Sequence, residues 1–312
     1  MRLLRRARSL IETVDPEKPD IRSEWLVARI RLSSTLSALT AESSGPSAGL
    51  DGLAEVRRLV EHVGDPLVKE ELAGGVEHNR GLLLLNAGLI DDAITLSDAA
   101  LVHYERRLAA GEPTPALAEM IVKSLWSRGT ASTRLGLIGH AREDLTRAAA
   151  LAGEHGLLDR AADASHSLGL LDLRVGDVPA ALRRYESSER AYRDQDLEVP
   201  VLLGLHRAQA LLAAGMADEA GGQLDGMLPE MRADHSITRN LADVELYRAA
   251  AAYMTDDLDL ARAMAAGARR RMRRWGCETC VANATLVGLR VDTRLALRSG
   301  ATPRSLPRRA LA

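Results

Sequence analysis

The residues closest to a chemical site are Cys277 and Cys280, spaced as C-x-x-C in a chain with no other cysteine. Tetrahedral zinc needs two further ligands. The nearest histidine, His235, lies 42 residues before Cys277 and has no second ligand at metal spacing. A redox pair is the alternative, because Arg273 and Arg274 would stabilise thiolates, but the βαβ context of thioredoxin-like proteins is missing. We therefore expect small apolar packing at both cysteines and no metal.

Other catalytic patterns are missing from the sequence. The eight histidines are scattered, with no Ser/His/Asp arrangement, HExxH or Gly-rich phosphate loop. The pair Asp91–Asp92 falls at the expected start of a helix, where carboxylates offset the helix dipole. The sequence predicts no catalytic residue, no enzyme activity and no cofactor.

Arginine is concentrated near the C-terminal end. Residues 262–312 hold twelve arginines and two acids, a net charge of +10 that leaves −12 on residues 1–261. Such asymmetry can mark a surface for nucleic acid or for an acidic partner. The basic run 269–274 ends an expected helix, where cations favour the dipole, and only Trp275 is near for stacking on bases. A solvated or docking face is favoured over nucleic-acid binding.

The composition is typical of a soluble, well-packed protein, with 46% apolar and 27% charged residues. Aromatic residues make up only 3% and phenylalanine is absent, so packing depends on Leu, Ala and Val. The N-terminal segment has no apolar run of signal-peptide length, and no stretch reaches the roughly 18 apolar residues of a membrane span. With no disulfide framework possible, we expect a cytoplasmic protein without membrane contact.

A repeated motif must position any functional residues. It consists of a small residue (the first position), a turn-forming residue seven positions later (the turn position) and an alanine twelve positions later (the alanine position). It occurs at Gly81/Gly88/Ala93, Gly129/Gly136/Ala141, Gly169/Gly176/Ala181, Ala208/Gly215/Ala220 and Ala249/Asp256/Ala261. The first positions are 39 to 48 residues apart, a period that indicates a solenoid. Small residues allow two helices to cross closely, and the turn position suits left-handed backbone.

Helical periodicity around the motif predicts a helix A and a helix B in each repeat. The predicted pairs are 68–88/90–110, 115–136/138–155, 158–175/178–194, 199–214/217–233 and 237–254/258–275. A first pair, 21–41 and 50–63, is separated by a longer loop at Glu42–Pro46. Residues 3–14 and 278–298 are expected as unpaired helices, and 299–312 as a basic, disordered tail. We expect an all-α, right-handed superhelix of about six hairpins over residues 1–298.

The spacing of the motif resembles the tetratricopeptide repeat, although these units are longer than its roughly 34 residues and lack its Trp and terminal Pro. Four runs, at 78–101, 125–149, 165–186 and 239–276, are together similar to the repeat region of actinobacterial CHAT-domain proteins. In that family the repeats precede a caspase-like domain with a His/Cys pair, which implies a sensing or docking role for the repeats. This sequence has no such domain, so peptidase activity is not implied for it.

The resemblance implies a concave face lined by A helices. The arrangement of Lys and Asn residues with which some tetratricopeptide repeats bind a carboxylate is not present in this sequence. The resemblance nominates as partner contacts His78, Asn79, Asn86, Trp126, Ser127, Arg134, His166, Arg174, His206 and Tyr247. An arginine stands directly before the first position of the motif in four of the five repeats: Arg80, Arg128, Arg207 and Arg248. We expect these arginines to be structural, pairing with acids such as Asp91, Asp144 or Asp218, rather than a ladder that grips an acidic peptide.

The sequence thus favours a non-enzymatic scaffold or sensor array that binds a protein or peptide, such as a CHAT-type peptidase domain. The alternative is a regulatory repeat module of a transcriptional regulator whose Arg-rich end contacts nucleic acid. A peptidase function would need a catalytic domain supplied in trans. Unpaired end helices would expose apolar faces, so self-association is also expected.

Overall fold

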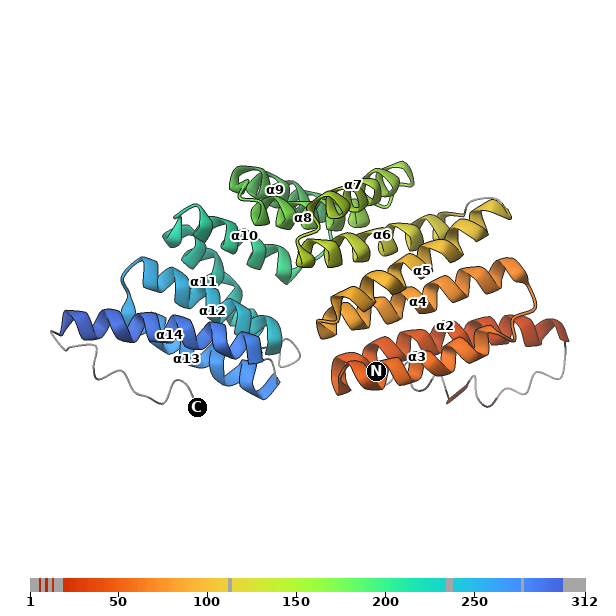
Figure 1. The fold of residues 1–312 in the computed structure, drawn as a ribbon, viewed down its shortest axis with the longest axis horizontal. Helices are drawn as coiled ribbons and strands as arrows, with labels where there is room; N and C mark the ends of the chain where they lie inside the picture. The colour runs from red at the N-terminus through yellow and green to blue at the C-terminus, as the bar shows by residue number, and fades with distance from the viewer. Residues whose placement is uncertain are drawn as a thin grey trace. The chain divides into compact units, whose positions relative to one another are not determined.

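The structure is a computed structural model that describes residues 6, 9–10, 13, 19–111, 114–233, 238–275 and 278–299. Every regular element in these residues is a helix (Figure 1), which confirms the all-α class. The five motif repeats form the pairs α4 (Pro66–Ala87) and α5 (Ile90–Ala109), α6 (Pro115–Leu135) and α7 (Ile138–Glu154), α8 (Leu158–Arg174) and α9 (Val178–Arg193), α10 (Val201–Ala213) and α11 (Ala217–Ala233), and α12 (Thr238–Met254) and α13 (Leu258–Trp275).

The turn position of the motif has left-handed backbone in all five repeats. Its φ is +84° at Gly88, +76° at Gly136, +89° at Gly176, +80° at Gly215 and +72° at Asp256. In the first repeat the Leu89 amide then donates to the Leu84 carbonyl over 2.9 Å, which closes the end of α4. Each A helix therefore ends within two residues of the turn position, because its backbone cannot continue the helix there.

The first position of the motif lies where the two helices of a pair cross. A Cβ on Gly81 would lie 3.3 Å from the Ala93 carbonyl oxygen, and one on Gly129 would lie 2.7 Å from Leu145 Cγ. Larger side chains would push the helices apart, so small residues at this position set the distance between A and B.

The alanine position is in the interior of the array in every repeat. Its five residues all have 0% exposure: Ala93, Ala141, Ala181, Ala220 and Ala261. The prediction placed these alanines only against their own A helix, but three of them also reach the next one. Ala93 shares a hydrophobic cluster with Ala131 of α6, Ala141 shares one with Leu168 of α8, and Ala261 shares one with Val291, beyond α13. The alanine position therefore also serves the packing between hairpins, which its spacing within one hairpin does not reveal.

Several helix starts combine a capping side chain with proline. Asp65 accepts hydrogen bonds from the Leu67 and Val68 amides at 2.8 and 3.2 Å, and Thr114 accepts one from the Leu117 amide at 3.2 Å. A proline follows each of these caps at the start of the helix, where its missing N–H costs nothing. These local signals explain why α4 and α6 begin close to their predicted positions.

The first pair differs from the prediction. Its helices, α2 (Pro19–Ser44) and α3 (Pro46–Val60), are separated by Gly45 alone, at φ +96°, so the longer loop at 42–46 was wrong. The helix predicted at 50–63 is present, but it begins four residues earlier and ends three residues earlier. Gly45 makes the turn and Pro46 starts the next helix. The close contact is supplied by α3: a Cβ on Gly49 would lie 2.6 Å from Ala41 Cβ, and one on Gly52 would lie closer still to Ser37 Oγ.

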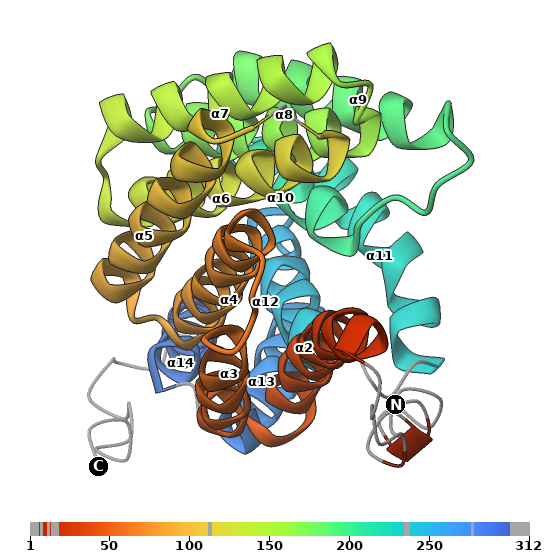
Figure 2. The ribbon, with the colours of Figure 1, turned by 90° about the vertical axis from the view of Figure 1, so that its right-hand side faces the viewer.

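The chain divides into two compact units, residues 1–171 and 172–312. Within the first unit, α4 lies beside both α2 and α6; within the second, α12 lies beside both α10 and α14 (Glu278–Arg298). Both views show α14 next to α13 (Figures 1 and 2). It therefore packs as a further A helix and buries Ala284 and Val291 against the last hairpin.

Some expectations fall on parts of the chain that are not described. The half-unit at 3–14 lies, apart from single residues, outside the described residues, as does the tail from residue 300. Among the described helices, none is long and apolar enough to cross a membrane.

Candidate functional site

Three successive A helices of the first unit line one pocket of about 450 Å³, which we name the α4–α6–α8 pocket. Each helix brings two or more side chains into it because their A-helix positions recur with the repeat. Its lining residues are His78, Asn79 and Leu82 from α4, Met120, Val122, Lys123 and Trp126 from α6, and Arg160 and Asp163 from α8.

Apolar side chains form one wall of the pocket. Trp126 is half-buried and packs against two hydrophobic clusters, one built from α5 to α8 and one from α7 and α8. Its indole Nε1 donates a 2.8 Å hydrogen bond to Ser167 Oγ on α8, which holds the ring in place. Leu82 and Met120, also half-buried, complete a surface that suits an apolar group.

His78 is a polar residue with only 5% exposure on the wall of this pocket. Its ring Nδ1 lies 3.2 Å from Ser124 Oγ in the interior of α6. Burial, with the nearby Lys123 charge, lowers the pKa of His78 to about 4, so the ring is neutral at pH 7. Its Nε2 has no hydrogen-bond partner among the described residues and is the ring nitrogen left for a ligand.

The charged groups of the pocket are paired with one another. Lys123 Nζ lies 2.6 Å from Glu119, and the Arg160 guanidinium lies 3.1 Å from Asp163 and 3.5 Å from Glu119. The Lys123 ammonium lowers the pKa of Glu119 by donating to it. Both cations therefore have an acidic partner inside the site, while the Arg160 Nε is buried without a hydrogen-bond partner in the described part of the chain.

The ten nominated contact residues differ in their exposure and in what they contact. His78, Asn79 and Trp126 meet in the pocket, whereas Ser127 is only 1% exposed. Asn86 and Arg174 are exposed, while His166, His206 and Tyr247 are half-buried, the last packed against the Leu205–Val244 cluster of the second unit. Arg134 donates to the Leu85 carbonyl over 2.8 Å, and so links α6 to the end of α4.

The repeat positions of the motif take no part in the lining of the pocket. Its first positions on α4 and α6, Gly81 and Gly129, are buried, and its alanines have no exposed surface with which to touch a ligand: Ala93, Ala141, Ala181, Ala220 and Ala261. These residues position the site by fixing the helices, while the side chains that face the pocket come from other places on the A helices.

Six lining residues were not nominated from the sequence: Leu82, Met120, Val122, Lys123, Arg160 and Asp163. Four of them carry a detectable signal. Lys123 and Asp163 both lie six residues before the first position of the motif, and Met120 and Arg160 both lie nine residues before it. Residues at one repeat position on neighbouring A helices lie on the same side of the array. The motif could therefore have found these two pairs.

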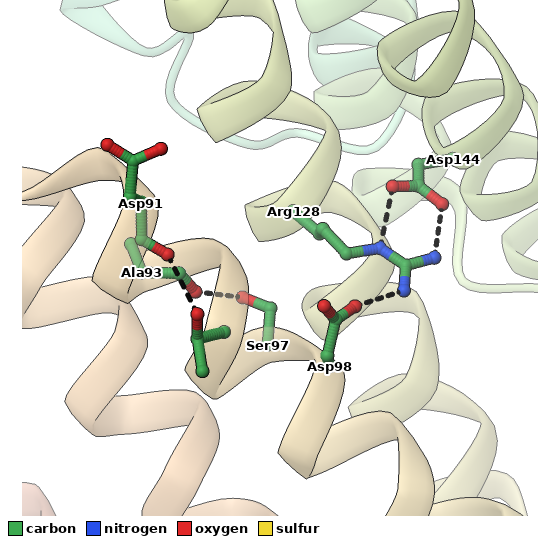
Figure 3. Close-up of polar contacts among 7 residues, drawn as sticks. Asp91, Ala93, Ser97, Asp98, Arg128 and Asp144 are labelled. Atoms are coloured by element: carbon green, nitrogen blue, oxygen red, sulfur yellow. Dashed lines mark hydrogen bonds and ion pairs between the residues drawn. The ribbon is translucent and has the colours of Figure 1, made fainter. Parts of the chain in front are cut away.

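The arginines before the first position bind carboxylates. Arg128 donates to both oxygens of Asp144 on α7, at 2.8 and 2.6 Å, and to Asp98 on α5 at 2.6 Å (Figure 3). Hydrogen bonding to Asp144 raises the pKa of Arg128 further above its ordinary value. Asp91 lies away from Arg128, at the start of α5 (Figure 3).

The other three arginines make similar contacts. Arg207 reaches Glu189 on α9 at 3.3 Å, Arg248 forms two hydrogen bonds to Asp225 on α11, and Arg80 pairs with Glu77 on its own helix. Three of the four arginines thus connect an A helix to the preceding B helix. Asp91 and Asp218, expected as partners, take no part in these pairs.

A second pocket, of about 400 Å³, lies in the second unit between α9, α10 and α11. Arg207 lines it together with Leu211 and Gln223. Gln223 already donates to the Gly204 carbonyl over 2.6 Å. None of the nominated contact residues reaches this pocket.

The described residues contain no group of three or more His, Cys, Asp or Glu side chains placed to hold a metal ion. Cys280 is half-buried and packs beside Ala284 and Met272, as the predicted apolar packing requires. It is not a free thiol, however, so the prediction of apolar packing is incomplete. Cys277 lies outside the described residues.

No protein-family model matches the chain, and no curated protein matches it in sequence. Solved structures are similar. A Rap protein complexed with Competence and Sporulation Factor matches with a TM-score of 0.62 at 12% identity, over 95% of this chain and 81% of that one. The apo form of RapI matches with a TM-score of 0.57 at 9% identity, over 87% of this chain and 73% of that one.

A third similar structure is a STAND-class signal-transduction ATPase with a tetratricopeptide repeat sensor, from Pyrococcus horikoshii. It gives a TM-score of 0.54 at 11% identity, over 92% of this chain and 42% of that one. At such identities the likeness shows the fold alone, a solenoid of tetratricopeptide-like hairpins.

Proposed function

We propose that the chain is a non-enzymatic array that binds a protein or peptide through its A helices, and that it acts in the cytoplasm. One observation carries the proposal: three successive A helices build a single pocket from apolar, hydrogen-bonding and charged side chains. Pockets of this kind, with an apolar wall and a few polar groups, are typical of ligand sites.

The similar structures support a recognition role. The Rap structure holds a Rap protein together with Competence and Sporulation Factor, and the repeats of the ATPase are described as a sensor. Following the resemblance of the four repeat runs, we propose a CHAT-type peptidase domain as the partner that this array docks or regulates.

Affinity purification from the native host, followed by mass spectrometry, tests this function. The baits are the wild-type chain and a Glu143→Ala variant, which alters an exposed residue on α7 outside the pocket. We expect both baits to retain the same protein, with a caspase-like domain, in stoichiometric amount. A purified complex that does not re-form from the separate components would contradict the proposal.

A second candidate function, nucleic-acid contact by a regulatory module, is favoured by one observation. Arg269, Arg270, Arg273 and Arg274 are exposed on α13 and make no ion pair with the described residues. A mobility-shift assay with duplex DNA between about 50 and 300 mM salt tests it. Retention that falls steeply with salt, and is lost when the four arginines become serine, would favour this function over the docking array.

A further inference from the structure

We infer that the α4–α6–α8 pocket recognises an uncharged apolar side chain of an extended peptide. Leu82, Met120 and Trp126 would contact that anchor side chain, while Asn79 and His78 hydrogen-bond the peptide backbone beside it. The inference rests on the proposed function and goes further, because it names the chemistry of the ligand at one site.

The apolar wall determines the size and type of the anchor. About 450 Å³ falls in the roughly 300–1,000 Å³ range of small-ligand sites and leaves room for a single large side chain with its backbone. The Trp126 ring is held by Ser167, so its face is presented without a large loss of side-chain entropy. Leucine, methionine and aromatic anchors fit this surface.

Three lining residues of the pocket have a polar group without a hydrogen-bond partner among the described residues: Asn79, His78 and Arg160, whose Nε is buried. Asn79 is half-buried and makes no hydrogen bond with the described residues, although its amide can donate and accept at once. His78 also lines the pocket, with its Nδ1 held by Ser124 and no partner for its Nε2 among the described residues. A peptide amide, which offers one N–H and one C=O, would satisfy Asn79.

The charges of the pocket argue against a charged anchor. Lys123 is paired with Glu119, and Arg160 with Asp163. An acidic anchor would have to break one of these pairs to reach a cation, and a basic anchor would have to do the same to reach a carboxylate. An uncharged anchor leaves both pairs intact, so it is the one that the site accepts without electrostatic cost.

Intrinsic fluorescence can test the inference, because Trp126 is one of only three tryptophans. The full-length chain carrying Trp25→Phe and Trp275→Phe reports on this pocket alone. The probe is a positional-scanning library of hexapeptides with acetylated N-termini and amidated C-termini, which carry no terminal charge. We expect the active pools to share Leu, Met, Phe or Trp at one position, with a Kd that changes less than about twofold between roughly 50 and 500 mM NaCl.

Variants then assign the contacts. Asn79→Ala should weaken binding of the best peptide at least about fivefold, and Met120→Ala should do so if Asn79→Ala fails to fold. The matched control Asn283→Ala, at an exposed site on α14, should leave the Kd unchanged. Best binders with Asp, Glu, Lys or Arg as the anchor, no response of Trp126 to any pool, or equal affinity of the folded Asn79→Ala protein would each overturn the inference.

The same variant separates this inference from the proposed function. If the partner from the native host binds wild-type and Asn79→Ala chains equally, the array function stands and the pocket assignment is wrong. If no partner protein re-forms a complex, but peptides still bind and Asn79→Ala weakens their binding, the pocket assignment is supported and the docking function is wrong.

Discussion

At the scale of single residues, His78 makes the stability of the folded chain depend on pH. Its folded pKa of about 4 lies below the ordinary value near 6.5, so the unfolded chain binds the proton more readily. Stability contributed by neutral His78 is complete above about pH 6.5 and is lost as pH falls toward about 4. Between pH 7 and pH 5 the loss in unfolding free energy is about 2 kcal/mol.

Urea unfolding of the wild type and of His78→Gln at pH 7 and pH 5 measures this loss. The wild type should lose about 2 kcal/mol more than the variant between the two pH values, because glutamine does not titrate. The same pH dependence in both proteins would show that His78 is protonated as easily when folded as when unfolded.

Arg128 is the strongest structural link among the arginines. Arg128→Met would leave the side chain of Asp144, only 8% exposed, without its partner, at a cost of about 3 kcal/mol. We expect a clearly lower melting temperature by circular dichroism. Changing Asp98, whose side chain is 52% exposed, to Ala should cost less than about 1 kcal/mol. An unchanged melting temperature for Arg128→Met would rule out the structural role.

At the scale of elements, the crossing of A and B helices depends on small residues. In Gly129→Ala the new Cβ would meet Leu145 Cγ at 2.7 Å and Asp144 Cβ at 3.2 Å, neither of which is the end of a flexible chain. We expect α6 and α7 to separate and stability to fall by about 1–3 kcal/mol. Chemical denaturation measures the change.

The control for this crossing is a glycine with open space around it. Gly226 lies exposed inside α11, and a Cβ there meets no atom within 4 Å. Gly226→Ala should stabilise the chain by up to about 1 kcal/mol, because alanine has the higher helix propensity. If Gly129→Ala stabilised the protein as Gly226→Ala does, helix crossing would not be limited by side-chain size.

At the scale of the whole molecule, the outer surface of α14 favours self-association. The helix buries Ala284 and Val291, but Leu286 and Leu297 remain 50% and 63% exposed. We expect the wild type to form concentration-dependent oligomers in analytical ultracentrifugation, and Leu286→Glu/Leu297→Glu to remain monomeric. Leu89→Glu/Leu158→Glu, which alters leucines exposed in the first unit, should behave as the wild type. A wild-type monomer at high concentration would contradict this expectation.

The sequence by itself determined the repeated hairpins, because their signals act over a few residues. Gly88 and Asp256 end helices through left-handed backbone, and Asp65 starts one through a cap. The loop of the first pair was predicted wrongly because this pair lacks the motif. Its close helix contact is made by Gly49 and Gly52 of α3, the second helix, against α2.

Only the tertiary structure decided how the A-helix residues around the pocket are buried and paired. His78, Asn79 and Trp126 could be nominated from their place in the repeat, but the angle at which hairpins stack turned Ser127 into the core and brought Arg160 beside Glu119, 41 positions earlier. Burial and charge pairing arise between helices distant in sequence, so no local pattern specifies them.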